Sequence, residues 1–225
     1  MALRKSSEIP KDAVAFADEG DAALYIWDIV YEWDKLSQTW ALRFGPMILG
    51  GINAMCGLTI NKYYRHRFKL GPYGYLSSAI PICLMPGILT TLFHNYLIST
   101  DMLLMKSKSC PICYETKAAA IQSGFGLAYP LLLGSTAALL FANRYSSFRV
   151  PELTEGPKVM LKFLTKHTKP FTGTLIYMAA IQVAASSILT YFEMRNSFKL
   201  RHELLEIEKK LLQERGEELN NEIIN

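Results

Sequence analysis

Four long stretches of the sequence contain no Asp, Glu, Lys or Arg, and they constrain the fold more than any other feature. They cover residues 44–61, 70–100, 118–143 and 170–192. Each reaches the roughly 18 uncharged residues that mark a candidate transmembrane helix. Because backbone N–H and C=O groups in lipid can bond only to one another, a segment that spans a membrane in this way is helical. The pattern therefore predicts an all-α, multi-pass membrane protein, built as a bundle of four transmembrane helices.

Composition excludes several other classes of protein. Of the 225 residues, 50% are hydrophobic and 20% are charged, whereas about 25% charged residues are usual in soluble proteins. With 14 Gly, 10 Pro and 4 Cys, the chain is not collagen-like, disordered or a disulfide-dense secreted protein. The net charge of +4 is modest. Basic residues flank the uncharged stretches, so we expect a lipid surface and no nucleic acid as their partner.

The boundaries of the stretches predict three parts of the chain. An N-terminal segment at residues 1–43 carries an interfacial helix, and a soluble, charged helical tail occupies residues 193–225. The transmembrane domain lies between them at residues 44–192, with spans at about residues 44–61, 73–99, 118–143 and 170–192. In the second stretch, Pro72, Pro81 and Pro86 indicate a start in a loop and a kink near the middle of the helix.

Charge between the spans predicts an orientation. The loops at residues 62–69 and 144–169 are rich in Lys and Arg, and we expect them to face the cytoplasmic-type compartment and to contact anionic lipid. Both termini and the loop at residues 101–117 then face the opposite compartment. The segment before the first span has more acidic than basic residues and no early apolar core. We therefore expect internal targeting information rather than a cleavable presequence.

Aromatic residues mark the N-terminal segment. Apolar side chains recur at helical spacing in residues 22–40, and Trp27, Trp33 and Trp40 are the three tryptophans of the chain. Indole rings favour the headgroup level of a bilayer, which predicts a helix at the membrane interface. The alternative is a short helix packed on another subunit.

Two further segments have an amphipathic pattern. Residues 158–166 place lysines opposite apolar side chains, which suits a basic helix lying on an anionic leaflet. The tail from Arg195 carries leucines at heptad-like spacing, over too short a length for a coiled coil of its own. We interpret the tail as an amphipathic helix that docks on a partner helix.

Cys110 and Cys113 form a CxxC pair, a spacing that supports a disulfide, thiol exchange or half of a zinc site. No second Cys pair or close His pair completes a zinc site, so no metal is expected. We favour a disulfide that ties the loop before the third span. The alternative is a four-helix membrane thiol oxidoreductase that uses Cys110 and Cys113. Cys56 and Cys83 stand singly in predicted spans, where we expect a packing role.

His94 is the one imidazole inside a predicted span. An intramembrane titratable group suggests a proton path or a ligand, and the alternative is a side chain that simply reaches the interface. The sequence has no phosphate-binding loop, catalytic triad or paired intramembrane carboxylates. No catalytic residue and no cofactor are therefore expected.

Small residues spaced four apart recur in the predicted spans. Such pairs let helix backbones approach closely, which is how helices associate in lipid. They either close the protein's own bundle or offer a face to a larger membrane subunit. The pairs are Gly50 and Ala54, Gly124 and Ala128, Gly134 and Ala138, and Ala180 and Ala184.

Several short motifs carry a resemblance to a known family. They are the run Gly51-Ile52-Asn53-Ala54-Met55-Cys56-Gly57-Leu58, followed by Asn61 and Arg65-His66-Arg67, then the Cys110/Cys113 pair, Leu127-Ala128-Tyr129-Pro130 and Arg144-Tyr145. Together they are similar to the transmembrane protein 126 family of mitochondrial inner-membrane proteins. The likeness runs from about residue 50 to residue 191. The aromatic N-terminal segment and the charged tail depart from it.

This resemblance implies a non-enzymatic assembly factor of mitochondrial respiratory complex I, located in the inner membrane as a multi-pass protein. The partners that it implies are complex I membrane-arm subunits and other complex I assembly factors. Taken with the small-residue pairs, it suggests that the chain holds a membrane-arm intermediate while the tail recruits a soluble partner. The thiol oxidoreductase is the competing function.

Overall fold

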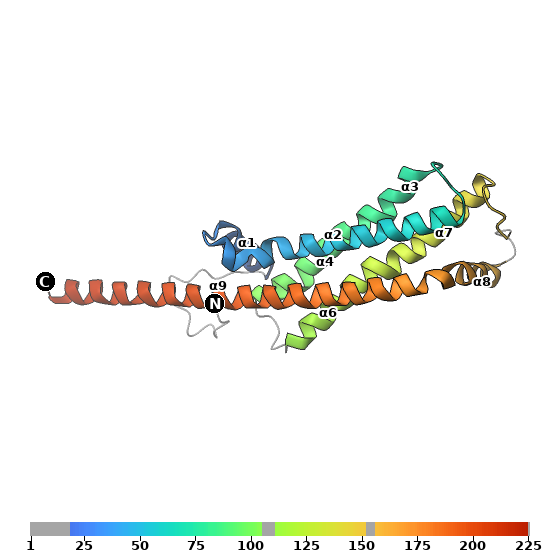
Figure 1. Cartoon of the computed structure of the whole chain (residues 1–225). Coiled ribbons are helices and arrows are strands. Elements are labelled where there is room, and N and C mark those ends of the chain that lie inside the picture. Colours follow the sequence, from blue (N-terminus) through green and yellow to red (C-terminus); the bar gives the residue numbers. More distant parts are fainter. Residues whose placement is uncertain (1–18, 105–110, 152–155, 225) are drawn as a thin grey trace.

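The structure of the chain, a computed structural model, describes residues 19–104, 111–151 and 156–224 (Figure 1). These residues are helical apart from short connections, and no β-strand occurs among them. Four helical segments are long and apolar enough to cross a membrane: Leu36–Arg67, Tyr75–Leu104, Pro111–Arg144 and Lys158–Arg215. The prediction of an all-α membrane protein with four spans is confirmed.

The first span is preceded by a short helix that is fixed to it. α1 (Glu19–Glu32) leads through a turn into α2 (Leu36–Arg67). The guanidinium of Arg43 on α2 donates to the Val30 carbonyl at 2.6 and 2.9 Å and to the Trp33 carbonyl at 2.8 Å. Since the last carbonyls of a helix have no partner inside it, Arg43 satisfies the end of α1. α2 begins at Leu36, well before the first uncharged stretch at residue 44.

The second span is an α-helix interrupted by two wider turns. It consists of α3 (Tyr75–Ala79), the π-helical η2 (Ile80–Leu84), α4 (Met85–His94), the π-helical η3 (Asn95–Ser99) and α5 (Thr100–Leu104). Pro81 lies at the start of η2 and Pro86 at the start of α4. Pro72 lies in the turn before α3, so the second stretch does begin in a loop. A proline has no N–H to donate, which favours an irregular turn at this point.

The third span also contains a π-helical turn, whereas the fourth is one long helix. α6 (Pro111–Ser123), η4 (Gly124–Ala128) and α7 (Tyr129–Arg144) form the third span. After α8 (Pro157–Thr168) and the 3₁₀ turn η6 (Lys169–Phe171), α9 runs from Thr172 to Ile224. Figure 1 shows α9 passing along the bundle and projecting beyond α1. The tail is thus the continuation of the fourth span.

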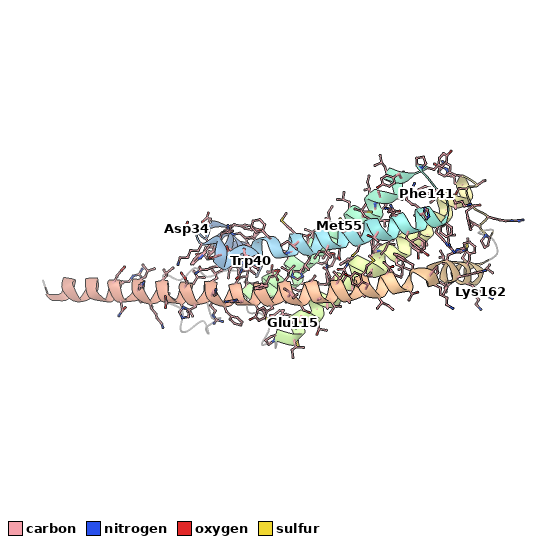
Figure 2. All side chains as sticks on the ribbon, in the orientation of Figure 1. Asp34, Trp40, Met55, Glu115, Phe141 and Lys162 are labelled. Atoms are coloured by element: carbon pink, nitrogen blue, oxygen red, sulfur yellow. The ribbon has the colours of Figure 1, made fainter. Side chains whose placement is uncertain are left out.

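α2 lies at the centre of the packing, in contact with α4, α7 and α9. Asp34, before α2, and Lys162, on α8, lie toward opposite ends of the bundle (Figure 2). An aromatic cluster with Tyr64 and Phe68 forms the core near α8, and a second cluster joins α1 to α2, α5 and α9. The two clusters hold the two ends of the bundle together.

Large apolar side chains cover much of the outer surface. Leu92, Tyr96 and Leu132 are each more than half exposed, and Met55 on α2, labelled in Figure 2, is 64% exposed. In water, contiguous apolar surface of this kind favours association. In a bilayer it contacts lipid chains, which agrees with the four spans.

Candidate functional site

A layer of polar side chains crosses the interior of the bundle, with one residue from each span. Asn53 of α2, Thr90 of α4, Gln122 of α6 and Gln182 of α9 are all fully buried. The Asn53 amide donates to Thr90 Oγ1 at 2.5 Å, and the Gln122 amide donates to Gln182 Oε1 at 2.6 Å and to the Leu49 carbonyl at 3.2 Å. Interhelical hydrogen bonds of this kind stabilise a membrane bundle by about 1 kcal/mol each. The layer fixes how the four spans are rotated about their axes.

Gly126 allows the third span to approach this layer. A Cβ atom at Gly126 would overlap Asn53 Oδ1 and Gln182 Nε2. Gly126 lies in the π-helical turn η4, and single π turns inside α-helices are frequent at functional sites. The role of Gly126 was not predictable from the sequence, because its partners lie on two other helices.

A buried contact between two ionisable side chains joins the second and fourth spans. His94 Nε2 is 3.0 Å from Glu193 Oε2 and 3.2 Å from Glu193 Oε1, and Ser99 Oγ donates to Glu193 Oε2 at 3.3 Å. Both ionisable side chains are fully buried, so His94 does not reach the outer surface of the bundle. A Cβ at Gly45 would lie 2.6 Å from Glu193 Oε1, and glycine there leaves room for the carboxylate.

The sequence pattern placed Glu193 in the soluble tail and did not predict its pairing with His94. A signal for it exists in the sequence. Gln182, Ser186, Thr190 and Glu193 recur at helical spacing on α9, and all four side chains are buried. A polar stripe that continues out of an apolar stretch indicates an inward-facing side of a membrane helix.

Two of the predicted small-residue pairs lie inside the bundle. A Cβ at Gly87 of α4 would lie 2.9 Å from the Gly50 carbonyl oxygen and 3.4 Å from Ala54 Cβ, so α2 and α4 approach closely there. Gly134 and Ala138 are buried on α7, which packs against α2. Gly87 has no glycine or alanine four positions away, so the spacing of such pairs did not predict its contact with Gly50.

The other two pairs face outward. Gly124 and Ala128 are exposed on η4, and Ala180 and Ala184 are exposed on α9. A Cβ at Gly124 would meet no atom within 4 Å. On each helix the residue midway between the pair, Gly126 or Gln182, is the buried one, so each pair points away from the core. The protein therefore presents small residues on its lipid-facing surface.

The N-terminal helix packs on the chain's own helices. The Trp27 indole donates to Thr100 Oγ1 at 3.0 Å, and Val30 is buried beside Leu42, Leu103 and Leu200. α1 therefore joins three spans at one end of the bundle.

A polar contact fastens the same end of the bundle to α9. The Gln38 amide donates to Glu203 Oε1 at 2.6 Å, and Lys35 Nζ lies 3.2 Å from Glu203 Oε2. Glu203 lies beyond the uncharged stretch of α9, in the charged part that the sequence predicts to be a soluble tail. The hydrogen bond from Gln38, and then that from Lys35, lower the pKa of its carboxyl.

The apolar side of α8 also packs on the protein. Phe163 stacks on Phe68 with ring centroids 6.1 Å apart, and Met160 and Leu164 contact the same cluster. The prediction placed this apolar side on a leaflet, whereas Met160, Phe163 and Leu164 pack on the bundle. The lysines remain exposed on the other side: Lys158, Lys162 and Lys166.

The cysteines provide no described redox pair. Cys113 is exposed in the first turn of α6, whereas Cys110 lies outside the described residues. The structure therefore does not favour the thiol oxidoreductase. Cys56 and Cys83 are buried in the first and second spans. Within residues 19–104, 111–151 and 156–224, no group of three or more His, Cys, Asp or Glu side chains is placed to hold a metal ion.

Comparisons with known proteins give a consistent result. The model of the family described as Transmembrane protein 126 matches residues 25–203. A Drosophila melanogaster protein named "Transmembrane protein 126" is 36% identical over 214 residues, which cover 95% of this chain and 96% of that protein. No solved structure matches the chain. The matches extend beyond residues 50–191 on both sides, so the expectation that the N-terminal segment and the start of the tail depart from the shared pattern is wrong.

Proposed function

The chain belongs to the transmembrane protein 126 family, and from that premise we propose that it is a non-enzymatic assembly factor of respiratory complex I. In this role it holds a membrane-arm intermediate in the mitochondrial inner membrane. Its partners are membrane-arm subunits and other assembly factors of the complex. Binding and release, rather than bond chemistry, are its activity.

The observation that carries this proposal is the outward position of two small-residue pairs. Gly124 with Ala128 and Ala180 with Ala184 are exposed on spans whose buried sides are already occupied by the polar layer. Lipid chains are as apolar as leucine, so burial of apolar surface does not favour a protein neighbour over lipid. Close approach of two helix backbones does favour a protein neighbour over lipid, because it adds van der Waals contact. These faces therefore suit a transmembrane helix of a client subunit.

The strength of such contacts suits a factor that leaves its client. Helix association at a small-residue face depends on packing and on hydrogen bonds of about 1 kcal/mol or less each. A few contacts of this size hold an incomplete subunit without preventing its release. In the finished complex, contacts between the client and the other subunits replace its contacts with this protein.

The projecting part of α9 supplies a second binding element. Beyond Leu204, which packs at the end of the bundle, Leu205, Ile207, Leu211 and Leu212 are exposed. In water this row of apolar side chains favours a partner helix. The tail thus recruits another assembly factor while the spans hold the membrane client.

A rescue experiment tests the proposal. Cells that lack the protein are supplied with the natural chain, with Gly124→Leu or with Gly51→Leu, and the rate of complex I assembly is followed on native gels. Gly51 is the matched control, because it is also exposed, has open space around a Cβ and is not part of a small-residue pair. We expect the natural chain and Gly51→Leu to restore assembly and Gly124→Leu to fail. Normal assembly without the protein contradicts the role itself, and full rescue by Gly124→Leu contradicts the use of this face.

A further inference from the structure

A depression of about 770 Å³ opens beside the C-terminal part of α2, where the chain turns toward α3. Lys62, Arg65, His66 and Lys69 line it from α2 and the turn. On the other side it is bounded by the turn at Gly71 and by Tyr75. Four basic side chains therefore converge on one hollow at the end of a membrane span.

Within the part of the chain that the structure describes, no acidic side chain forms an ion pair with the lysines of this depression. The nearest acidic residues along the sequence are Asp34 and Asp101, each separated from the turn by most of a span. Among the ion pairs of the described residues, none includes Lys62 or Lys69. Both lysines are exposed, so their ammonium groups are available to an anion.

Arg65 lines the depression and also fixes its shape. Its side chain is 6% exposed and donates to the Gly71 carbonyl at 2.6 Å, to the Tyr73 carbonyl at 2.8 Å and to Ser78 Oγ at 3.1 Å. The same guanidinium lies 5.1 Å from the centre of the Tyr75 ring. Arg65 therefore fixes the turn that forms one wall, while its charge adds to that of the lysines.

The lining changes from charged to apolar along α2. Leu58 lines the end of the depression that points along the span, and it is 40% exposed. The helical rise places Leu58 roughly 13 Å before Arg67, the last residue of α2. A ligand that fills the depression therefore needs an anionic group at one end and a hydrocarbon part at the other. A phospholipid in the adjoining leaflet has this arrangement.

We propose that the depression is a binding site for an anionic phospholipid, with the phosphate group between Lys62 and Lys69 and an acyl chain along Leu58. Basic pockets at the ends of transmembrane helices recognise such head groups because the lipid supplies charge and apolar surface together. A free phosphate ion shares the charge but not the hydrocarbon part. This inference does not depend on the proposed role in complex assembly.

The test measures lipid retained by the full-length protein. The chain is purified in mild detergent with equal amounts of phosphatidylglycerol and phosphatidylcholine, and retained lipids are counted by native mass spectrometry. We expect a preference for phosphatidylglycerol that falls about 20-fold in the Lys62→Gln, Lys69→Gln double variant, since each lysine near a membrane surface contributes a several-fold factor. The matched control, Lys158→Gln with Lys166→Gln, removes two exposed charges from α8 outside the depression. It should keep the preference.

Two further arms separate the phospholipid from a free anion. Leu58→Trp leaves all four basic side chains in place but fills the apolar end, so it should also reduce retention of phosphatidylglycerol. Excess inorganic phosphate should not displace the lipid from the natural chain. The proposal is wrong if both double variants lose the preference equally, which indicates leaflet charge alone. It is also wrong if inorganic phosphate displaces the lipid while Leu58→Trp has no effect.

Discussion

His94 and Glu193 meet inside the bundle, with Nε2 and Oε2 3.0 Å apart and with side chains that are 1% and 0% exposed. The contact joins the end of α4 to α9. Ser99 adds a hydrogen bond to the same carboxylate. Both partners are ionisable and shielded from solvent, so each depends on the other for its stability in the interior.

Removing either member of this pair should destabilise the protein strongly. Glu193→Ala leaves His94 without its partner, and His94→Ala leaves a buried carboxylate whose remaining donor is Ser99. We expect each to lower the free energy of unfolding by about 3–5 kcal/mol. The measurement is unfolding by increasing denaturing detergent, followed by circular dichroism. The double variant should be much less destabilised than the sum of the two, and simple additivity contradicts direct pairing.

Gly126→Ala should destabilise the bundle through one added methyl group. That methyl overlaps the side-chain amides of Asn53 and Gln182, and overpacking of a well-packed interior costs about 1–3 kcal/mol. Gly173→Ala is the control, because Gly173 is an exposed glycine of α9 with open space around it. Alanine there should be neutral or slightly stabilising. Thermal unfolding in detergent compares the two, and equal midpoints for both variants refute the close approach at Gly126.

Ending the chain after Glu206 should remove binding of soluble partners without changing the stability of the bundle. This variant keeps Leu200, Leu204 and Glu203, which join α9 to the N-terminal end of the bundle. It removes the exposed tail with Leu211 and Leu212. We expect an unchanged thermal midpoint but loss of soluble partners in affinity purification.

Leu211→Glu with Leu212→Glu in the full-length chain should reproduce the effect of this truncation on the partners. Retention of every soluble partner by both variants argues against a docking role for the tail.

Replacing Cys110 and Cys113 by serine should leave the rate of complex I assembly unchanged. A binding role for the protein needs no thiol exchange, and an exposed Cys113 lies outside the buried layers of the bundle. The check is rescue of complex I in cells that lack the protein, together with an assay of thiol turnover in membranes. Loss of both activities in the variant revives the oxidoreductase function.

Hydropathy was sufficient to predict the four spans because each uncharged stretch is desolvated independently of the others. The exact helix ends were not predictable in this way. α2 starts at Leu36, before the first uncharged stretch, and its Arg43 bonds the end of α1. α9 continues past Phe192, and its Glu193 is buried against His94. The polar side chains of Arg43 and Glu193 are each stabilised by a hydrogen-bonding partner from another helix.

For the small-residue pairs too, the sequence predicted the segments but not which side of each helix is buried. Their spacing identified Gly50 with Ala54 and Gly124 with Ala128 by one rule, yet the first pair contacts α4 and the second faces outward. Nothing local distinguishes them. The difference arises from Asn53, Gln122 and Gln182, whose hydrogen bonds require one particular rotation of each helix.

By itself, the amino-acid sequence determined which segments are helical and surrounded by lipid, because that choice depends on the hydration of each segment alone. Only the tertiary structure decided which side of each helix is buried, which polar residues meet, and which small residues remain for a partner. Those choices depend on contacts between helices, and in lipid a neighbouring helix is no more apolar than its surroundings. Shape and hydrogen bonding therefore select the arrangement, and both are properties of the assembled bundle.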